Sequence, residues 1–355
     1  MTTSVHVLRQ IDVGDSIDLD RASATLDHRA RRAELSKQPA GAGVVLRREP
    51  LELTLEPADV GPFHAEVRAR LFDFGVVAIR FTLSVAESDG TALVALAGQL
   101  SQAGAIFDAK ARDIWHAMAR EITSAIVPWE ESDAGQLIED FTIFVLPALP
   151  SGQMDAATVL AHLLSGEPRE RKLAPVMIQE LARRAIRYYD DDLVLVDYDA
   201  AVIVDQDDVR TLVDIFEIAS AQLLELRFYE GMLTRSIEKL LRDVRMARTA
   251  AWLFRSPFRQ LAHRAALLAL ELGELSDRLE RAITLKGDTY SVQVYREAAA
   301  RFRLAEADAS VKEKVETIGR VSEVLGHEIH TRRDLLLEGM VIVLIAFEVL
   351  MALRH

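Results

Sequence analysis

The sequence predicts an α+β protein: an N-terminal mixed α/β domain, then long antiparallel helices in a coiled-coil-like hairpin, and a C-terminal transmembrane helix. Three patterns predict this order. Short runs of branched and aromatic residues come first, heptad-spaced apolar residues follow, and a nearly unbroken apolar run closes the chain. The expected divisions are a partly flexible N-terminal segment at 1–43, an α/β domain at 44–205, a long helical hairpin or bundle at 207–334, and a transmembrane anchor at 335–353.

Composition limits the possible functions. The 355 residues include 55 Asp and Glu against 42 Lys and Arg, for a net charge of −13, so we expect no direct nucleic-acid binding. Cysteine is absent, which excludes disulfides, thiolate nucleophiles and Cys-ligated metals. Residues 1–20 contain no apolar h-region, so no secretory signal is expected.

The α/β domain is predicted from strand and helix patterns. In the run Leu71–Leu83, branched and aromatic residues predict one strand, and Gly75 indicates a bulge or a close backbone approach. Residues 193–196 and 201–204 predict a hairpin around Asp197–Asp199. The other predicted elements are strands at 44–46, 51–55 and 138–146, and helices at 91–100, 108–126, 156–164 and 176–188.

From residue 207 the pattern is helical. Ten positions from Leu212 to Val244 alternate steps of four and three, and only Glu230 among them is charged. Glu230 either sets helix register from a buried position or reaches water where the seam is shallow. A second seam runs over 261–282, and a third, less regular helix over 295–329 continues without a proline into the tail.

The run 335–353 must be buried in protein or in lipid. Nineteen residues in a helix span roughly 28 Å, close to the hydrocarbon thickness of a bilayer. Glu338 and Glu348 lie near its two ends, where an ionised side chain reaches the interface, and Gly339 allows close helix approach. We favour a transmembrane anchor over a core helix of a soluble oligomer or a helix lining a homomeric pore.

Arginines around this run predict its orientation. Arg332 and Arg333 precede the span and only Arg354 follows it, which keeps the N-terminal bulk in the cytoplasm. The expected location is therefore the inner (cytoplasmic) membrane, with a single pass and with membrane lipid as a partner.

No catalytic motif is present. The sequence has no P-loop, no dinucleotide-binding glycine motif and no nucleophile elbow, so we expect neither an enzyme nor a cofactor. Glu323, His327 and His330 have helical spacing suitable for a metal. A polar face next to the membrane is the favoured interpretation of these three residues.

Three stretches resemble the required-for-meiotic-nuclear-division family, also known as a sporulation-protein family and a domain of unknown function. They are Phe72–Arg80, Ala219–Glu230 and Leu337–Val349. The resemblance implies a membrane-attached protein, and a ribosome held at the membrane as a partner. At 285–292 the sequence lacks the family's Pro-x-x-Phe-Trp element.

The leading hypothesis is a non-enzymatic, tail-anchored scaffold that forms a homo-oligomer through residues 207–330. The alternative is a homomeric ion channel or transporter with a cytoplasmic α/β domain, because the order of elements is similar to that of magnesium channels. An undetected hydrolase or nucleotide-binding enzyme is the third hypothesis.

Overall fold

The computed structural model describes residues 3–33, 43–85, 89–129, 137–150, 152, 154–167, 171–207, 209–250, 260–267, 269–270, 273, 283–286 and 289–352. At 247–250 and over most of 328–352 it describes the backbone but not the side chains. The chain forms two compact units. The first comprises Met1–Phe228 and Leu279–Ala307, and the second comprises Tyr229–Arg278 and Asp308–His355.

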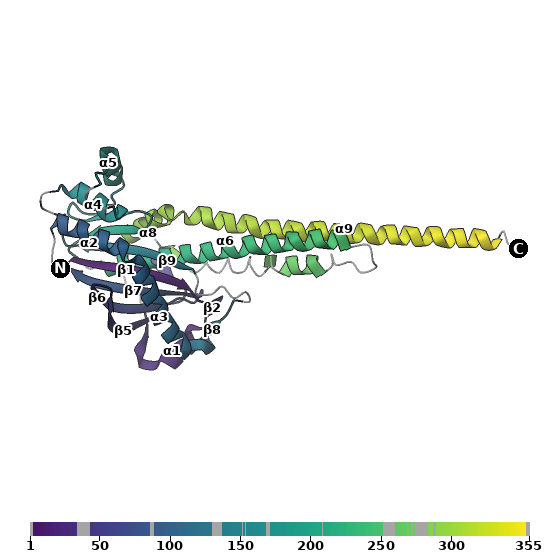
Figure 1. Ribbon diagram of the computed structural model, residues 1–355, viewed down its shortest axis with the longest axis horizontal. Helices are drawn as coiled ribbons and strands as arrows, with labels where there is room; N and C mark the ends of the chain where they lie inside the picture. Colours follow the sequence, from purple (N-terminus) through teal and green to yellow (C-terminus); the bar gives the residue numbers. More distant parts are fainter. Residues whose placement is uncertain are drawn as a thin grey trace. The chain divides into compact units, whose positions relative to one another are not determined.

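The first unit is built on an eight-stranded sheet (Figure 1) with the order β10-β11-β9-β1-β7-β6-β5-β3. All neighbours pair antiparallel except β11 and β9, which are parallel. The strands are β1 (Thr3–Asp12), β3 (Ala30–Arg32), β5 (Leu51–Val60), β6 (Phe63–Leu71), β7 (Val76–Val85), β9 (Ile138–Leu146), β10 (Leu193–Val196) and β11 (Ala200–Val204). β1 belongs to residues 1–43, which were predicted to precede the α/β domain as a partly flexible segment. It lies between β9 and β7 inside the sheet.

One face of the sheet is mainly apolar and helices cover it. Val5, Val7 and Ile11 of β1 are buried there with the inward-facing residues of the neighbouring strands. Buried side chains of the helices complete this core, for example Phe107 and Leu160. These helices are α1 (Leu19–Leu26), α2 (Gly90–Gln102), α3 (Gly104–Ile122), α4 (Ala156–Ser165) and α5 (Pro175–Arg183).

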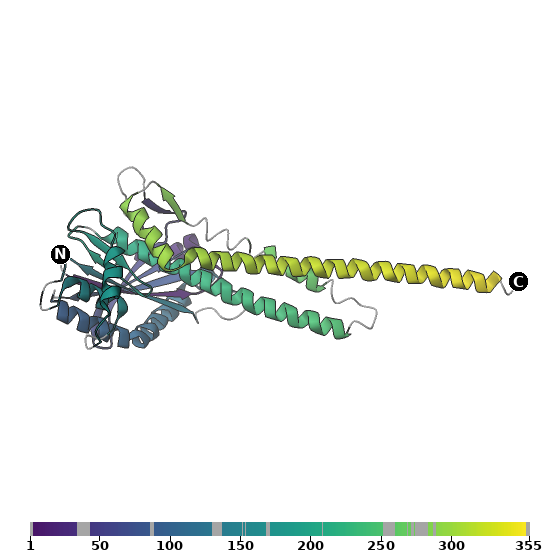
Figure 2. The same cartoon turned by 90° about the horizontal axis from the view of Figure 1, so that it is seen from above.

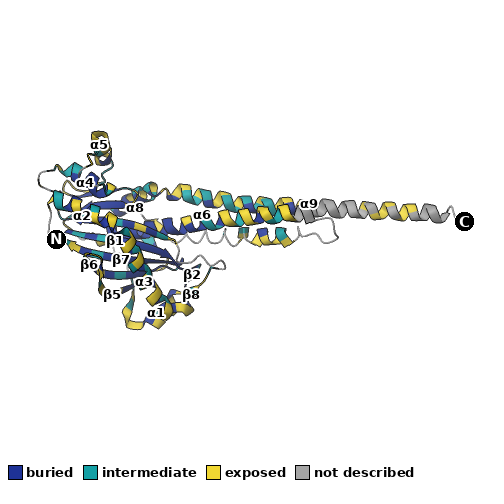
Figure 3. Ribbon diagram, in the orientation of Figure 1, coloured by how far each residue is buried: buried dark blue, intermediate teal, exposed yellow. Residues whose placement is uncertain are grey.

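The opposite face is covered by the start of α6 (Arg210–Ala250) and by α8 (Tyr290–Arg301). Phe141 of β9 packs against Phe216 of α6 and against Phe302, which follows α8. Every residue from 212 to 226 is buried, including those outside the predicted heptad seam (Figure 3). This part of α6 is therefore a core helix, because a two-helix coiled coil would bury only its seam.

Two small sheets complete the first unit. β4 (Gly43–Leu46) pairs with β12 (Ile283–Lys286), and this ribbon lies beside α8 (Figure 2). β2 (Ser16–Ile17) pairs with β8 (Ile126–Val127). Short 3-10 turns occupy Asp27–Arg29 and Thr123–Ala125.

The second unit contains the rest of α6 and most of α9 (Leu304–Ala352). Leu325 of α9 is buried, and Val244 and Leu261 pack against it. Ser322 Oγ donates a hydrogen bond to the carbonyl oxygen of Ala262 at 2.9 Å. The predicted second seam at 261–282 lies mostly outside the described residues.

The structure confirms a mixed α+β fold with a large N-terminal sheet. The predicted hairpin is present as β10 and β11, and the predicted strand at 138–146 is β9. The single strand predicted at Leu71–Leu83 is wrong, because the chain turns between β6 and β7. Gly75 has φ +87°, and a Cβ there would lie 1.8 Å from the carbonyl oxygen of Gly14. The predicted close backbone approach at Gly75 is thus confirmed.

Helix ends also differ from the prediction. The helix predicted at 176–188 ends at Arg183. The third long helix is divided into α8 and α9, because Arg303 adopts φ +53° and interrupts the helical hydrogen bonds.

Candidate functional site

The sheet face beneath α6 carries charged residues. Successive side chains on a strand point to opposite faces, and residues paired across strands share a face. The register pairs Glu52 of β5 with Arg70 of β6, and Arg68 of β6 with Arg80 of β7. All four side chains therefore lie on the face that α6 covers.

Two carboxylates of α6 meet these arginines. Arg70 Nη1 lies 3.0 Å from Asp214 Oδ1 and 3.0 Å from Glu217 Oε1, while its Nη2 donates to Glu52 Oε2 at 2.8 Å. Arg80 Nη1 donates to Asp214 Oδ1 at 3.2 Å, and its Nε lies 3.5 Å from Glu217 Oε2. We call Glu52, Arg70, Arg80, Asp214 and Glu217 the buried charge network.

The network is closed to solvent and nearly balanced in charge. The side chains of Arg70, Glu52 and Glu217 are exposed by only 5%, 6% and 1%. At the rim, Arg31 donates to Glu52 Oε1 at 2.6 Å and Arg68 Nη1 lies 3.7 Å from the same oxygen, so partly exposed cations offset the third carboxylate. Burial raises the pKa of Glu52, but hydrogen bonds from Arg31 and Arg70 outweigh it and lower the pKa to about 2.

The buried charge network is suited to holding α6 on the sheet rather than to converting a substrate. Its charged groups pair with one another across three strands and one helix. Arg70 and Arg80 each lie within ion-pair distance of a carboxylate on β5 and of two carboxylates on α6. Removing one partner would leave a buried charge uncompensated, which costs roughly 3–5 kcal/mol. The network therefore holds α6 in one register on the sheet.

A second group of polar side chains lies on the same face around β1. Gln10 Nε2 donates to Ser220 Oγ of α6 at 2.6 Å. Asp12 Oδ1 accepts from Trp129 Nε1 at 3.0 Å, and the Trp129 ring stacks on Phe228 of α6 with centroids 4.7 Å apart. Burial raises the pKa of Asp12 to about 7, although the hydrogen bonds from Trp129 and Gly14 oppose the rise.

Glu139 of β9 is the other buried acid in this group. It pairs with Gln10 in the strand register and accepts a hydrogen bond from Arg227 of α6. Burial raises the pKa of Glu139 to about 7, and the nearby Arg227 only partly offsets this effect. Burial thus raises the pKa of two acids on the face beneath α6 to about 7.

The structure places Glu230 in the second unit, on the part of α6 that faces α9. Its Oε1 accepts hydrogen bonds from Ser310 Oγ at 2.7 Å and from Lys314 Nζ at 2.8 Å. The Glu230 side chain is 41% exposed. The hydrogen bond from Lys314, followed by that from Ser310, lowers the pKa of Glu230. Glu230 therefore reaches water, as the second of the two predicted alternatives has it, and pairs with Lys314 between two helices.

The other predicted residues lie along α9. Glu323, His327 and Glu338 are exposed, whereas the side chains of His330, Arg332, Arg333, Gly339 and Glu348 lie outside the described residues. Among the described residues, no group of three His, Asp or Glu side chains could hold a metal ion. The trio Glu323, His327 and His330 is only partly described, so it stays a prediction.

No single helix, within the part of the chain that the structure describes, has the length and apolar composition of a membrane span. One bent pair meets the two criteria together: Gly90–Gln102 with Gly104–Ala125, at an angle of 59°. Leu93, Leu100, Phe107 and other side chains of this pair are buried against the sheet. The predicted transmembrane helix at 335–353 stays a prediction.

Sequence reasoning missed the buried charge network. The available signal was local: Arg68 and Arg70 occupy alternate positions in one strand, and Asp214 and Glu217 interrupt an apolar helix three residues apart. Those spacings put each set on one face of its element. They do not show that the faces meet.

Comparison with known proteins places this architecture in a family. Residues 2–210 match the family described as "Uncharacterized protein MJ0711, N-terminal domain". The protein "Uncharacterized protein MJ0711" of Methanocaldococcus jannaschii is 25% identical over 225 residues, which cover 62% of this chain and 68% of that protein. Neither description names an enzymatic activity. No solved structure matches this chain.

These matches correct the resemblance to the required-for-meiotic-nuclear-division family. That resemblance rested on three short apolar stretches, and such patterns recur in unrelated strands and helices. The ribosome partner rested on the same resemblance and loses its basis. The matched region contains the whole eight-stranded sheet and ends at the first residue of α6. The chain belongs to the MJ0711 N-terminal domain family.

Proposed function

We propose that the protein is a non-enzymatic scaffold attached to a membrane by residues 335–353, with its N-terminal bulk in the cytoplasm. One observation carries this proposal. The helix α9 continues to Ala352, and five of its large apolar side chains are exposed by 54–64%: Met340, Val341, Ile342, Leu344 and Ile345. Contiguous exposed apolar side chains mark surfaces that a membrane or a protein covers.

The size of this exposed surface supports coverage by lipid. Covering five half-exposed large side chains contributes on the order of 5 kcal/mol. The exposed residues 340–342 and 344–345 follow one another around the helix, so they do not form a single stripe for one partner helix. A hydrocarbon environment covers all sides of a helix at once.

Self-association of the second unit is the other part of the proposal. Three apolar side chains of this unit are exposed: Leu241 of α6 by 42%, Val324 of α9 by 66%, and Leu270, which lies between these two helices in the sequence, by 62%. Exposed leucine and valine on long helices favour packing against another copy. The buried charge network then keeps the start of α6 fixed on the sheet of each copy.

Membrane attachment is tested with the full chain and two variants. Val341→Lys with Leu344→Lys places two charges in the apolar run, at roughly 2.5–3.5 kcal/mol each near a bilayer centre. We expect this double variant and a chain lacking 335–355 to leave carbonate-washed membranes, and the exposed-site control Val176→Lys to stay. A truncated chain that still pelleted with washed membranes would refute the anchor. Light scattering in detergent reports the number of copies.

An ion channel is the second candidate, because Glu338 exposes a carboxylate beside the apolar residues of α9. Carboxylates within a membrane segment commonly line an aqueous path or pair between subunits. Ion flux into liposomes that contain the full chain, compared with Glu338→Gln and Glu348→Gln, separates the two candidates. Absence of flux in the parent protein excludes the channel.

A further inference from the structure

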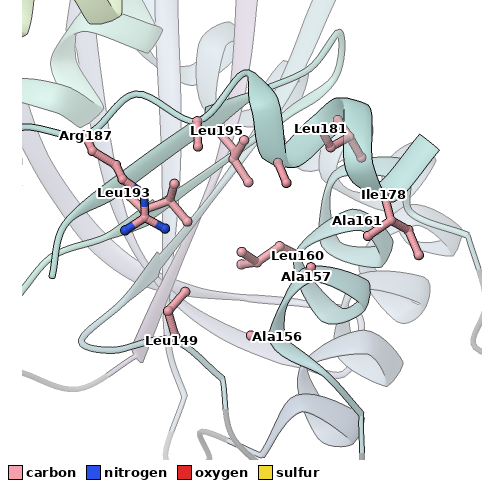
Figure 4. A pocket seen from close by; sticks show the side chains of 12 residues that line it. Leu149, Ala156, Ala157, Leu160, Ala161, Ile178, Leu181, Arg187, Leu193 and Leu195 are labelled. Atoms are coloured by element: carbon pink, nitrogen blue, oxygen red, sulfur yellow. The ribbon is translucent and has the colours of Figure 1, made fainter. Parts of the chain in front are cut away.

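A small apolar hollow opens between α4, α5 and β10 in the first unit (Figure 4). Its volume is about 190 Å³. Twelve residues line it, and Arg187 is the only one that is not leucine, isoleucine or alanine. A buried apolar cavity of 150 Å³ holds benzene, so this hollow has room for a hydrocarbon of about seven carbon atoms.

Alanines create the hollow. Ala157 and Ala161 of α4 and Ala182 of α5 lie where the two helices approach β10, and their short side chains leave the space unfilled. Leu160, Leu181 and Leu193 form the buried walls. Leu149 is 47% exposed and marks the open side. An apolar group entering from this side exchanges water for leucine and alanine side chains.

Arg187 supplies the one charge at the hollow. Its side chain runs along Leu193 and brings the guanidinium to the edge of the hollow (Figure 4). Nη1 donates to the carbonyl oxygens of Asp190 and Asp192, both at 3.2 Å, which orients the group. Among the described residues, no carboxylate forms an ion pair with Arg187. A guanidinium held in this way has donors suited to a carboxylate.

We propose that the hollow binds an alkyl carboxylate, with six to eight carbons inside and the carboxylate on Arg187. The apolar lining binds the alkyl part of the ligand, and Arg187 binds its carboxylate. This inference does not depend on membrane attachment. It uses only residues of the first unit, and all of them except Leu193 and Leu195 lie between β9 and β10.

The test uses the full chain in zwitterionic lipid nanodiscs, with octanoate and octanol as probes and calorimetry as the readout. Comparison of variants in the same discs removes the contribution of lipid partitioning. We expect Arg187→Gln to weaken octanoate binding at least tenfold and octanol binding less than twofold. The matched control Arg183→Gln, on the exposed side of α5, should leave both unchanged.

The hollow itself is tested by filling it. Ala157→Phe, with Ala185→Leu as a second variant in case the first fails to fold, should abolish binding of both probes. Hexanoate should bind about fifteenfold more weakly than octanoate, because each methylene contributes about fourfold. Failure of octanoate to bind the parent chain, or equal effects of Arg187→Gln and Arg183→Gln, would overturn the proposal. Binding of an acetyl-Leu-Leu-Asp peptide without octanoate would assign the hollow to a protein partner instead.

Discussion

Removal of Arg70 tests whether the buried charge network holds α6 on the sheet. Arg70 contacts Glu52, Asp214 and Glu217 at 2.8, 3.0 and 3.0 Å, and its side chain is 5% exposed. Arg70→Met keeps most of the hydrocarbon volume and leaves the three carboxylates to Arg80 and to the rim residues Arg31 and Arg68. Breaking a buried pair in this way costs roughly 3–5 kcal/mol of unfolding free energy.

The assay follows the fluorescence of Trp129 during urea unfolding. Trp129 stacks on Phe228 of α6 and donates to Asp12 of β1, so its emission reports whether α6 lies on the sheet. Trp115→Phe and Trp252→Phe in every sample leave Trp129 as the single tryptophan of the chain.

The matched control is Arg184→Met. Arg184 pairs with Glu180 four residues earlier on α5, and the two side chains are 32% and 53% exposed. Such a surface pair contributes about 0.3–0.5 kcal/mol. Equal losses for Arg70→Met and Arg184→Met, both below about 1 kcal/mol, would refute the positioning role of the network.

Three further changes have expected outcomes. The pKa of Asp12 is raised from 3.8 to about 7, so between these values the folded state keeps a proton that the unfolded chain has lost, and stability should fall from about pH 4 to pH 7. Asp12→Asn should make the fall of the urea midpoint over that range shallower, and the fall that remains is expected from Glu139, whose pKa is also raised to about 7. Glu230→Ala should lower the free energy of unfolding by about 0.5–1 kcal/mol, since the ion pair with Lys314 is half-exposed, and should speed amide exchange in α9. The double variant Glu230→Lys with Lys314→Glu should recover part of this loss. Gly75→Ala should lower the melting temperature because its Cβ would meet the Gly14 carbonyl oxygen, whereas Gly98→Ala in α2, with open space around it, should raise stability by up to ~1 kcal/mol; a melting temperature of the Gly75 variant at or above the parent's would contradict the close approach.

Local periodicity explains what could be predicted. The hairpin of β10 and β11 and the strand β9 follow from uninterrupted apolar runs between turn residues. The heptad-like spacing after residue 207 correctly indicated a long helix. It did not distinguish a coiled-coil seam from a core helix, because residues 212–226 are buried on every side.

The buried charge network could not be predicted from spacing. Arg80 and Asp214 are 134 positions apart, and their meeting depends on which sheet face α6 covers. The position of β1 between β9 and β7 could not be predicted for the same reason, since strand order depends on pairing between distant segments. The apolar hollow is also tertiary, because alanines of α4 and α5 leave space only where both helices approach β10.

The sequence by itself determined that strands and short helices precede long helices, that 335–353 is apolar apart from Glu338 and Glu348, and that cysteine chemistry is absent. Each of these depends on neighbouring residues, whose side-chain period and composition can be read directly. Only the tertiary structure decided which charges are buried together, which strand lies at the centre of the sheet and where an apolar hollow remains. Those features arise when faces of separate elements come into contact, and the free energy of that contact depends on the whole fold.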